Sequence, residues 1–501
     1  MDDGLSELRR RLGEINDLGR ARALLAWDER TQMPPGGAAP RAEQVATLTR
    51  ILHERLASDD VGILLEDLAE WAGSLPRESD EASLVRVARR EWEKARRVPA
   101  ELRAETARAA SLGEQAWARA RADSDFASFL PHLERMVELK RRYVECFQPF
   151  AHPYDPLLDD FEPGMTTAEL RPLLSELRAG LVPLIAAIAE RGEVVDDSCL
   201  YGEFEAEGQA KLARRVVEGL PIPAGEWRLD ATVHPFATAI APTDVRITTR
   251  YEPSYIGTAL WAVIHEAGHG MYENGIAPEL ARTPLGDGTS LGFHESQSRL
   301  WENWVGRGRP YLGHMLPTLR ELFPGRFASV DAEGLYLAAN RVRPSLIRVE
   351  ADEVTYNLHV ILRFELELEI LEDRLALRDL PEAWNALMRE MLGVEVPDDA
   401  HGVLQDVHWS GGAFGYFPTY SLGNLIAAEV WEGAREALPD LDEELARGEL
   451  SPLRDHLRER IHRHGSKLEP RELVERLTGG PLTVAPLVGH LGRKFGEIYG
   501  L

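Results

Sequence analysis

Apolar residues recur every three or four positions along most of the chain, which is the period of an amphipathic helix. The pattern predicts helices over residues 5–29, 81–122, 126–147 and 170–192, and it resumes at residue 258 and continues to the C-terminus. One segment differs. Residues 228–253 are rich in Thr, Val and Ile and alternate in polarity, which predicts a short antiparallel sheet. We therefore expect a mostly α fold with one small sheet.

The breaks between the predicted helices are short Pro- and Gly-rich stretches, such as 31–40 and 283–292. They are too short to separate independent domains, so the sequence predicts a single large helical domain over residues 1–501. Within it we expect a β segment at about 228–253, a metal-site region at 258–306 and a substrate-groove region at 340–425.

Composition excludes several classes of function. The net charge is -26, which argues against binding to nucleic acid or to an anionic membrane surface. The first residues are charged, and no apolar run approaches 18 residues, so neither a signal peptide nor a membrane span is predicted. Cys146 and Cys199 form no CxxC pair. A cytoplasmic protein is the expectation.

The stretch "AVIHEAGHGMYENG", which begins at Ala262, contains two histidines four positions apart. On a helix, His265 and His269 point the same way and can bind one ion, and Glu266 lies close enough to act on a water at that ion. This is the H-E-x-x-H pattern of zinc hydrolases, which combines two ligands with a general base. Gly268 and Gly270 weaken the helix but would permit close approach of a neighbouring segment.

A catalytic zinc site needs a third protein ligand. The sequence "GFHESQSRLWENWVG" follows at 292–306, and Glu295 lies in it 26 residues after His269. A hairpin of two helices would bring Glu295 to the histidines and complete a His₂Glu set. The alternative is a first-turn glutamate that interacts with the helix dipole. His294 is the competing ligand.

Several further motifs resemble one family. In chain order they are "WDERTQMPPGGAAPR" (27–41), "HPF" (234–236), "DVRIT" (244–248), "HESQSR" (294–299), "IRVEADEVTYNLH" (347–359), "GVLQDVHW" (402–409) and "GYFPTYSLGN" (415–424). Together with HEAGH they resemble the carboxypeptidase Taq family of metal-dependent carboxypeptidases, across nearly the whole chain. The resemblance implies an elongated helical fold with a deep groove, similar to neurolysin and angiotensin-converting enzyme.

The resemblance also implies an activity. It predicts removal of single C-terminal residues from peptides with broad specificity, one divalent ion per chain, either zinc or cobalt, and a homodimer. The His₂Glu set favours zinc. One alternative is an oligoendopeptidase with the same fold and metal site. A less favoured alternative, from another class, is a peptide-binding protein without catalysis.

A carboxypeptidase must hold the free α-carboxylate of its substrate, and an arginine fork suits that task. Residues 345–371 are predicted as one helix with a polar stripe of Arg348, Asp352, Thr355 and His359. Arg348 lies in the family's IRxxAD motif and is assigned to the substrate carboxylate, with an ordinary paired arginine as the alternative. Asp352 either pairs with Arg348 or orients a metal-bound histidine, and the sequence does not separate the two.

Two groups are candidate donors to the oxyanion that forms during hydrolysis. His408 and Tyr420 lie in a glycine-containing stretch, twelve residues apart as in neurolysin-like peptidases, and Tyr416 is the runner-up. The alternative is a packed aromatic loop. His234 and Arg246 are expected on the predicted strands, and their assignment to substrate binding rests on the family motifs alone.

Overall fold

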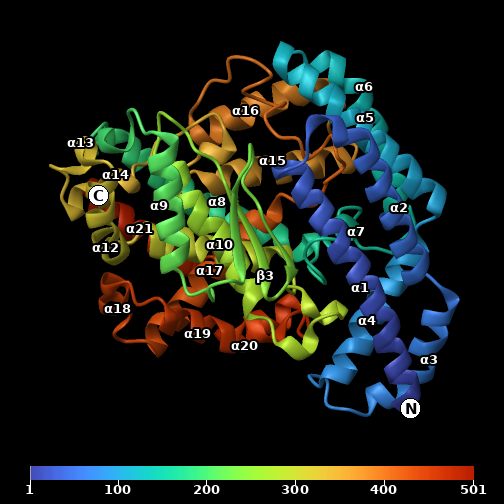
Figure 1. Ribbon diagram of the computed structural model, residues 1–501. Coiled ribbons are helices and arrows are strands. Elements are labelled where there is room, and N and C mark those ends of the chain that lie inside the picture. The colour runs from blue at the N-terminus through green and yellow to red at the C-terminus, as the bar shows by residue number, and fades with distance from the viewer. Residues whose placement is uncertain (1) are drawn as a thin grey trace. The chain divides into compact units, whose positions relative to one another are not determined.

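The computed structural model describes residues 2–501, and helices dominate it (Figure 1). The predicted mostly α fold with one small sheet is confirmed. The chain forms two compact units, and each is assembled from three separated stretches. The first unit comprises residues 2–96, Asp196–Ala339 and Glu429–Pro481, and the second comprises Arg97–Val195, Asn340–Ala428 and Leu482–Leu501.

The first unit contains the sheet and most of the helices. Its helices are α1 (Asp2–Thr31), α2 (Ala38–Leu56), α3 (Asp59–Gly73), α4 (Asp80–Arg97), α9 (Ala206–Gly219), α10 (Val263–Gly275), α11 (Leu291–Arg299), α12 (Arg309–Leu322), α13 (Pro324–Phe327), α14 (Ala332–Ala339), α18 (Leu441–Arg447), α19 (Ser451–Arg460) and α20 (Pro470–Thr478). Helix α17 (Pro418–Ala437) begins in the second unit and ends in the first. An apolar cluster from α1, α3 and α4 forms part of the core.

The sheet has three strands in the order β1-β3-β2, from β1 (Trp227–Ala231), β2 (Ala237–Ala241) and β3 (Asp244–Thr249). Strands β2 and β3 are antiparallel, but β1 runs parallel to β3, with Trp227 opposite Val245. The prediction of an antiparallel sheet is therefore wrong for one of its two pairings. Alternating polarity identifies a strand because one face is buried, but it carries no information about which neighbour the strand pairs with.

The buried face of the sheet packs on α10, which carries the HEAGH motif (Figure 1). Val245 and Ile247 of β3 are fully buried. A Cβ added at Gly270 of α10 would lie 2.6 Å from the Val245 Cγ1 atom, so the helix backbone rests directly on the strand. This support positions the first two candidate metal ligands.

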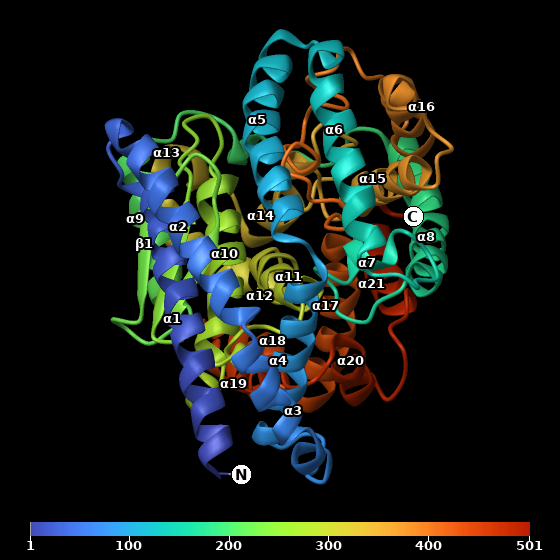
Figure 2. The same cartoon turned by 90° about the vertical axis from the view of Figure 1, so that its right-hand side faces the viewer.

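Within the described residues, the second unit consists of helices and loops and contains no strand. It contains α5 (Ala100–Asp123), α6 (Phe126–Glu145), α7 (Asp155–Leu158), α8 (Thr167–Arg191), α15 (Tyr356–Leu371), α16 (Leu380–Leu392) and α21 (Ala485–Tyr499). Helices α5 and α6 form an antiparallel pair (Figure 2). Ser124 turns the chain between them with a φ of 53°, and the Asp125 side chain caps α6 by accepting from Ser128 N.

Among the described residues, helix α8 alone is long and apolar enough, by length and composition, to cross a membrane. Its apolar stripe, which includes Leu174, Leu177 and Leu181, is buried against other helices of the second unit, among them α15 and α21. A core helix passes the same test of length and composition, so α8 is only weak evidence for a membrane span.

Candidate metal centre and active site

Two neighbouring helices carry the predicted metal site. Helix α10 continues from a π-helical segment, η3 (Thr258–Ala262), and α11 runs on into a second one, η6 (Leu300–Gly306). The Ser290 side chain starts α11 by accepting a hydrogen bond from Phe293 N at 3.1 Å. Short π-helical segments occur frequently at functional sites. Here they flank the two segments that contain the histidines and the glutamate.

Gly268 sets the distance between these helices. A Cβ at this position would lie 2.7 Å from Ser298 Cα and 2.8 Å from Gln297 O, both backbone atoms of α11. No residue larger than glycine fits without moving one helix, because backbone cannot rotate away as a side chain can. The close approach expected from the glycines of HEAGH is confirmed.

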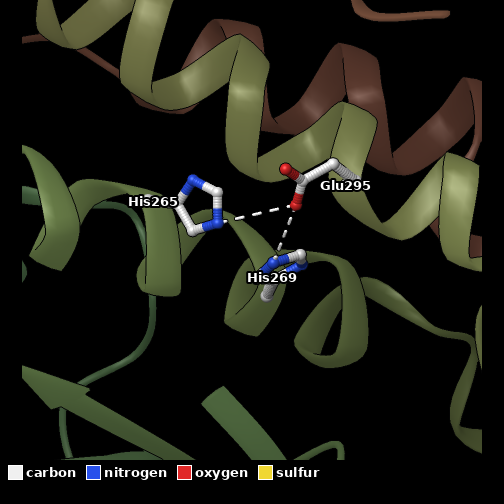
Figure 3. Close-up of side chains that lie close together, drawn as sticks. All are labelled: His265, His269 and Glu295. Carbon is white, nitrogen blue, oxygen red and sulfur yellow. Dashed lines mark ion pairs between the residues drawn. The ribbon is translucent and has the colours of Figure 1, made fainter. Parts of the chain in front are cut away.

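The structure brings the three predicted ligands together (Figure 3). One Glu295 carboxylate oxygen, Oε2, lies 3.5 Å from His265 Nε2 and 3.4 Å from His269 Nε2. Glu295 is buried, and the histidines are partly buried. The hairpin geometry inferred from the sequence therefore holds.

The spacing of these atoms fits a bound cation. Ligand atoms that lie 2.0–2.1 Å from a zinc ion at the tetrahedral angle are separated from one another by about 3.4 Å. The two N–O separations, 3.5 and 3.4 Å, match that value. The donor set of two imidazoles and one carboxylate is also the set that zinc hydrolases use.

Charged groups surround the ligands. Arg299 Nε donates to Glu295 Oε1 at 2.7 Å, and the Ser298 hydroxyl donates to Glu295 Oε2 at 2.9 Å. Burial would raise the pKa of Glu295, but Arg299 and the two histidines outweigh burial and hold that pKa well below its usual range. Glu295 is therefore ionised, as a metal ligand must be.

Glu302 contacts the other ring nitrogen of His265. Its Oε2 lies 3.0 Å from His265 Nδ1, and Arg307 Nη2 donates to its Oε1 at 3.1 Å. Burial opposes ionisation of Glu302, yet the bond to His265 and the nearby Arg299 lower its pKa to about 2. A carboxylate in this position orients the ring and makes Nε2 a better ligand.

Glu266, the predicted base, is buried beside His265. Burial raises its pKa to about 7, with further contributions from the carboxylates of Glu295 and Glu302. A carboxylate with a pKa near neutrality can both accept and release a proton. His294, the competing ligand, lies behind His269 with its Nδ1 2.8 Å from His269 Nδ1, outside the group of three ligands.

Arg348 lies in the second unit, in a short 3-10 turn (Arg348–Glu350), whereas α15 begins only at Tyr356. The prediction of one helix over 345–371 is wrong for its first eleven residues. Asp352 explains the late start, because its Oδ1 accepts from both Val354 N and Thr355 N at 3.0 Å and so turns the chain into the helix. These bonds, together with one from Arg343 N, are the observed role of Asp352.

Arg348 and Arg363 share one carboxylate. Arg348 donates to Asp406 Oδ1 from Nη2 at 2.8 Å and from Nε at 3.2 Å, while Arg363 Nε donates to Oδ2 at 2.6 Å. Burial would raise the pKa of Asp406, but the two guanidinium groups outweigh it and lower that pKa strongly. Two cations and one anion leave a net positive charge in a buried cluster, which favours an anionic partner.

His408 and Tyr420 lie at the same cluster. His408 Nε2 and the Tyr420 hydroxyl oxygen are 3.3 Å apart, and the Arg348 guanidinium lies 4.8 Å from the centre of the Tyr420 ring. Burial lowers the pKa of His408 to about 4, so its ring is neutral at pH 7. The ring of Tyr416, the runner-up, is 5.3 Å from that of His408.

A buried carboxylate holds the loop that carries His408. Glu367 of α15 accepts from Trp409 Nε1 at 2.8 Å, from Gly415 N at 3.1 Å and from the Tyr154 hydroxyl at 2.6 Å. These bonds fix the two ends of residues 409–415. The loop that follows His408 is therefore anchored to α15 at both ends.

The two strand residues behave differently. Arg246 lies on β3 as expected, where it pairs with Asp244 and stacks 4.8 Å from the ring of Trp27. His234 is exposed in the link between β1 and β2, so its placement on a strand is wrong. The HPF motif contains a proline, which lacks the N–H that a strand ladder requires.

Sequence reasoning assigned no role to Arg299, Glu302, Asp406 and Arg363. Arg299 and Glu302 follow Glu295 by four and seven positions, which is the spacing of one helix face, so a search around the ligand could have found them. Asp406 stands in the GVLQDVHW motif. No local pattern links Asp406 with Arg363, because 43 residues separate them.

The chain is similar to known proteins over nearly its whole length. A model of the carboxypeptidase Taq (M32) metallopeptidase family matches residues 7–495. Thermostable carboxypeptidase 1 of Thermus thermophilus is 43% identical over 505 residues, covering 99% of this chain and 98% of that protein. Carboxypeptidase 1 of Bacillus subtilis is 38% identical over 488 residues, covering 97% of each. The crystal structure of an M32 carboxypeptidase from Deinococcus radiodurans R1 superposes with a TM-score of 0.96 at 41% identity and covers 100% of both chains.

The fold, the three-ligand geometry and these relatives define a metal-dependent peptidase. Because the family model and the relatives match over nearly the whole length, the chain belongs to the carboxypeptidase Taq (M32) family of metallopeptidases. It is therefore a metallocarboxypeptidase, a hydrolase that depends on a divalent metal ion and acts on peptides.

Proposed function

We propose that the chain uses one zinc ion, bound by His265, His269 and Glu295, to remove single residues from the free C-terminus of peptides. The observation that carries this proposal is the 3.4–3.5 Å spacing of the Glu295 oxygen from the two histidine nitrogens. That spacing suits a tetrahedral ion with one position left for water. Cobalt would fit the same three donors.

Glu266 is proposed as the general base and acid. A bound divalent ion supplies Lewis acidity and lowers the pKa of water. Glu266 accepts the proton of the attacking water and then delivers it to the nitrogen of the leaving amino acid. Its buried position supports this role, because burial raises its pKa toward neutrality and makes the return of the proton easier.

The second cluster is proposed to act on the same substrate. Arg348 would bind the C-terminal carboxylate, and His408 and Tyr420 would donate to the oxyanion of the tetrahedral intermediate. The net positive charge shared by Arg348, Arg363 and Asp406 supports the first assignment. The neutral ring of His408 supports the second, because a neutral imidazole still carries one N–H donor. His234 and Arg246 are proposed as weaker substrate contacts, on family resemblance.

Mass spectrometry of peptide products tests the proposal. One unblocked peptide and its C-terminally amidated twin are incubated with metal-loaded protein, with and without a chelator. We expect a ladder of single-residue losses from the free peptide only, and none with the chelator. Internal cleavage of both peptides would instead assign the chain to the oligoendopeptidases and remove Arg348 from its role. Absence of cleavage would favour either an unusual metal requirement or a peptide-binding protein.

The cellular setting is a separate proposal. We infer a cytoplasmic homodimer, from the acidic composition and from the family resemblance. Light scattering of the purified protein should give about twice the 56.0 kDa mass of one chain. A mass equal to one chain would contradict the dimer.

A further inference from the structure

We propose that His294 and Glu273 are positioning residues that set the proton arrangement of the ligand His269, an inference that rests on the proposed metal site. His269 Nδ1 lies 2.8 Å from His294 Nδ1, and His294 Nε2 lies 2.8 Å from Glu273 Oε1. The three side chains form a hydrogen-bonded relay that leads from the His269 ring to the partly buried carboxylate of Glu273. Neither His294 nor Glu273 belongs to the ligand set.

Two ring nitrogens at 2.8 Å can share only one proton, so one ring donates and the other accepts. A ligand must present the lone pair of Nε2 to the metal, and the Nε2 of His269 is the atom that faces Glu295. The Nδ1 of His269 must then carry the proton and donate it to His294. His294 accepts at Nδ1, carries its own proton at Nε2 and donates to Glu273.

The surroundings hold the His294 ring in place. Its ring packs against Tyr272 with centres 5.1 Å apart. A Cβ added at Gly288 would lie 2.9 Å both from His294 Cδ2 and from Tyr272 Cε1, so backbone closes the remaining side. Glu273 follows His269 by four positions on α10 and therefore lies on the same helix face. The His294 ring is therefore enclosed by packed groups.

The two proposed metal-binding histidines differ in the group that contacts the Nδ1 atom. His265 meets the carboxylate of Glu302 directly at 3.0 Å, whereas His269 meets the imidazole of His294 first. Glu266, Glu295 and Glu302 already place three carboxyl groups around the ion site. An imidazole at position 294 supplies the orienting hydrogen bond without a fourth negative charge against the ligands, because the charge sits one residue further out at Glu273.

Different substitutions test the His269–His294 hydrogen bond and the His294–Glu273 hydrogen bond separately. His294→Asn keeps an acceptor near the position of Nδ1, and Glu273→Gln keeps an acceptor for His294 Nε2. His294→Leu and Glu273→Leu remove the relay. His152 of the second unit pairs with Glu372 at 2.7 Å, so His152→Leu is the matched control for loss of a histidine–glutamate pair.

The test measures metal binding directly on the purified full chain, by competition of Zn²⁺ with a chromophoric chelator and by the visible spectrum of Co²⁺. We expect His294→Leu and Glu273→Leu to weaken binding about 10–100-fold, the range for partners of ligand histidines. The double variant should be no weaker than His294→Leu alone, since the links act in series. His294→Asn, Glu273→Gln and His152→Leu should stay within a few-fold of wild type.

Unchanged affinity in a folded His294→Leu protein would overturn the relay. If His294→Leu does not fold, ¹⁵N NMR of histidine-labelled, zinc-loaded wild type decides, because the relay requires a proton on Nδ1 of His269 and on Nε2 of His294. A proton on Nδ1 of His294 would overturn it. If the wild-type chain binds no ion, the proposed metal site itself is contradicted. If wild type and variants bind the ion equally well, only the relay is contradicted.

Discussion

Glu266 and Glu295 show how the same type of side chain can have two different pKa values at one site. Both are buried, which by itself favours the protonated form. Glu295 has Arg299 at 2.7 Å and the two histidines beside it, and its pKa is held low. The pKa of Glu266 rises to about 7, because burial dominates and the neighbouring carboxylates add to it. The first is suited to bind a cation and the second to move a proton.

Replacing Glu266 by glutamine should separate these roles. Glu266→Gln keeps the size of the side chain and leaves the three ligands untouched, so we expect one metal ion per chain to remain. Turnover should fall by about 10²–10⁴-fold, the usual contribution of a general base. Metal analysis together with kcat on an unblocked peptide measures both. Activity within tenfold of wild type would remove Glu266 from the mechanism.

At the scale of elements, the site depends on the contact between α10 and α11. The proposed ligands come from both helices, and the backbone of Gly268 lies against the backbone of Ser298 and Gln297. Any side chain at position 268 must push the helices apart. The separation of His265 and His269 from Glu295 would then exceed the spacing that one ion can bridge.

Gly268→Ala should therefore reduce metal affinity as well as stability. We expect the metal ion to bind at least tenfold more weakly. We also expect the unfolding free energy to fall by about 1–3 kcal/mol, which is the cost of overpacking. Gly313→Ala in α12 is the control, because nothing lies within 4 Å of a Cβ there and alanine favours a helix by up to about 1 kcal/mol. Chelator competition and thermal melting measure both variants. Unaltered metal affinity in Gly268→Ala would mean that the helix contact does not set the site.

At this scale the sequence predicts the features that depend on neighbouring residues, and it does not predict those that depend on distant ones. His265 and His269 are four positions apart on one helix, so their common direction follows from helix geometry alone. The prediction for Glu295 depended on two helices forming a hairpin that brings it to the histidines, and the structure places the three side chains together. The direction of β1 and the start of α15 depend on pairing and on the Asp352 turn, and periodicity carries neither. The Arg348–Asp406–Arg363 cluster joins three distant positions and has no local signature.

At the scale of the molecule, stability should depend on pH through the buried Glu367. Burial raises its pKa to about 7 despite three donated hydrogen bonds, whereas the ordinary value is 4.5. The folded state therefore binds this proton more tightly than the unfolded state. Its contribution to stability is fully present below pH 4.5 and is lost as the pH rises through 7.

Comparison with the Glu367→Gln variant isolates the contribution of Glu367 to the pH dependence of stability, because both proteins share every other titrating group. The unfolding free energy of wild type relative to the variant should increase by about 2 kcal/mol between pH 8 and pH 5.5. Denaturant titrations at the two pH values measure the difference. A difference that does not change with pH would show that Glu367 keeps an ordinary pKa in the folded protein.

The three-stretch construction of each unit has a consequence for how the protein is made. Gln297 of α11 binds His462 at 2.8 Å, and His462 also packs against Gly275 at the end of α10. A ribosome must add 165 residues after Gln297 to reach His462. The nascent chain thus contains all three proposed metal ligands long before the segment that supports them has been made. A chain that ends before residue 462 contains the three proposed ligands but lacks the residue that packs against α10 and α11. We therefore expect the metal ion to bind only after residue 462 has been added and the chain has folded.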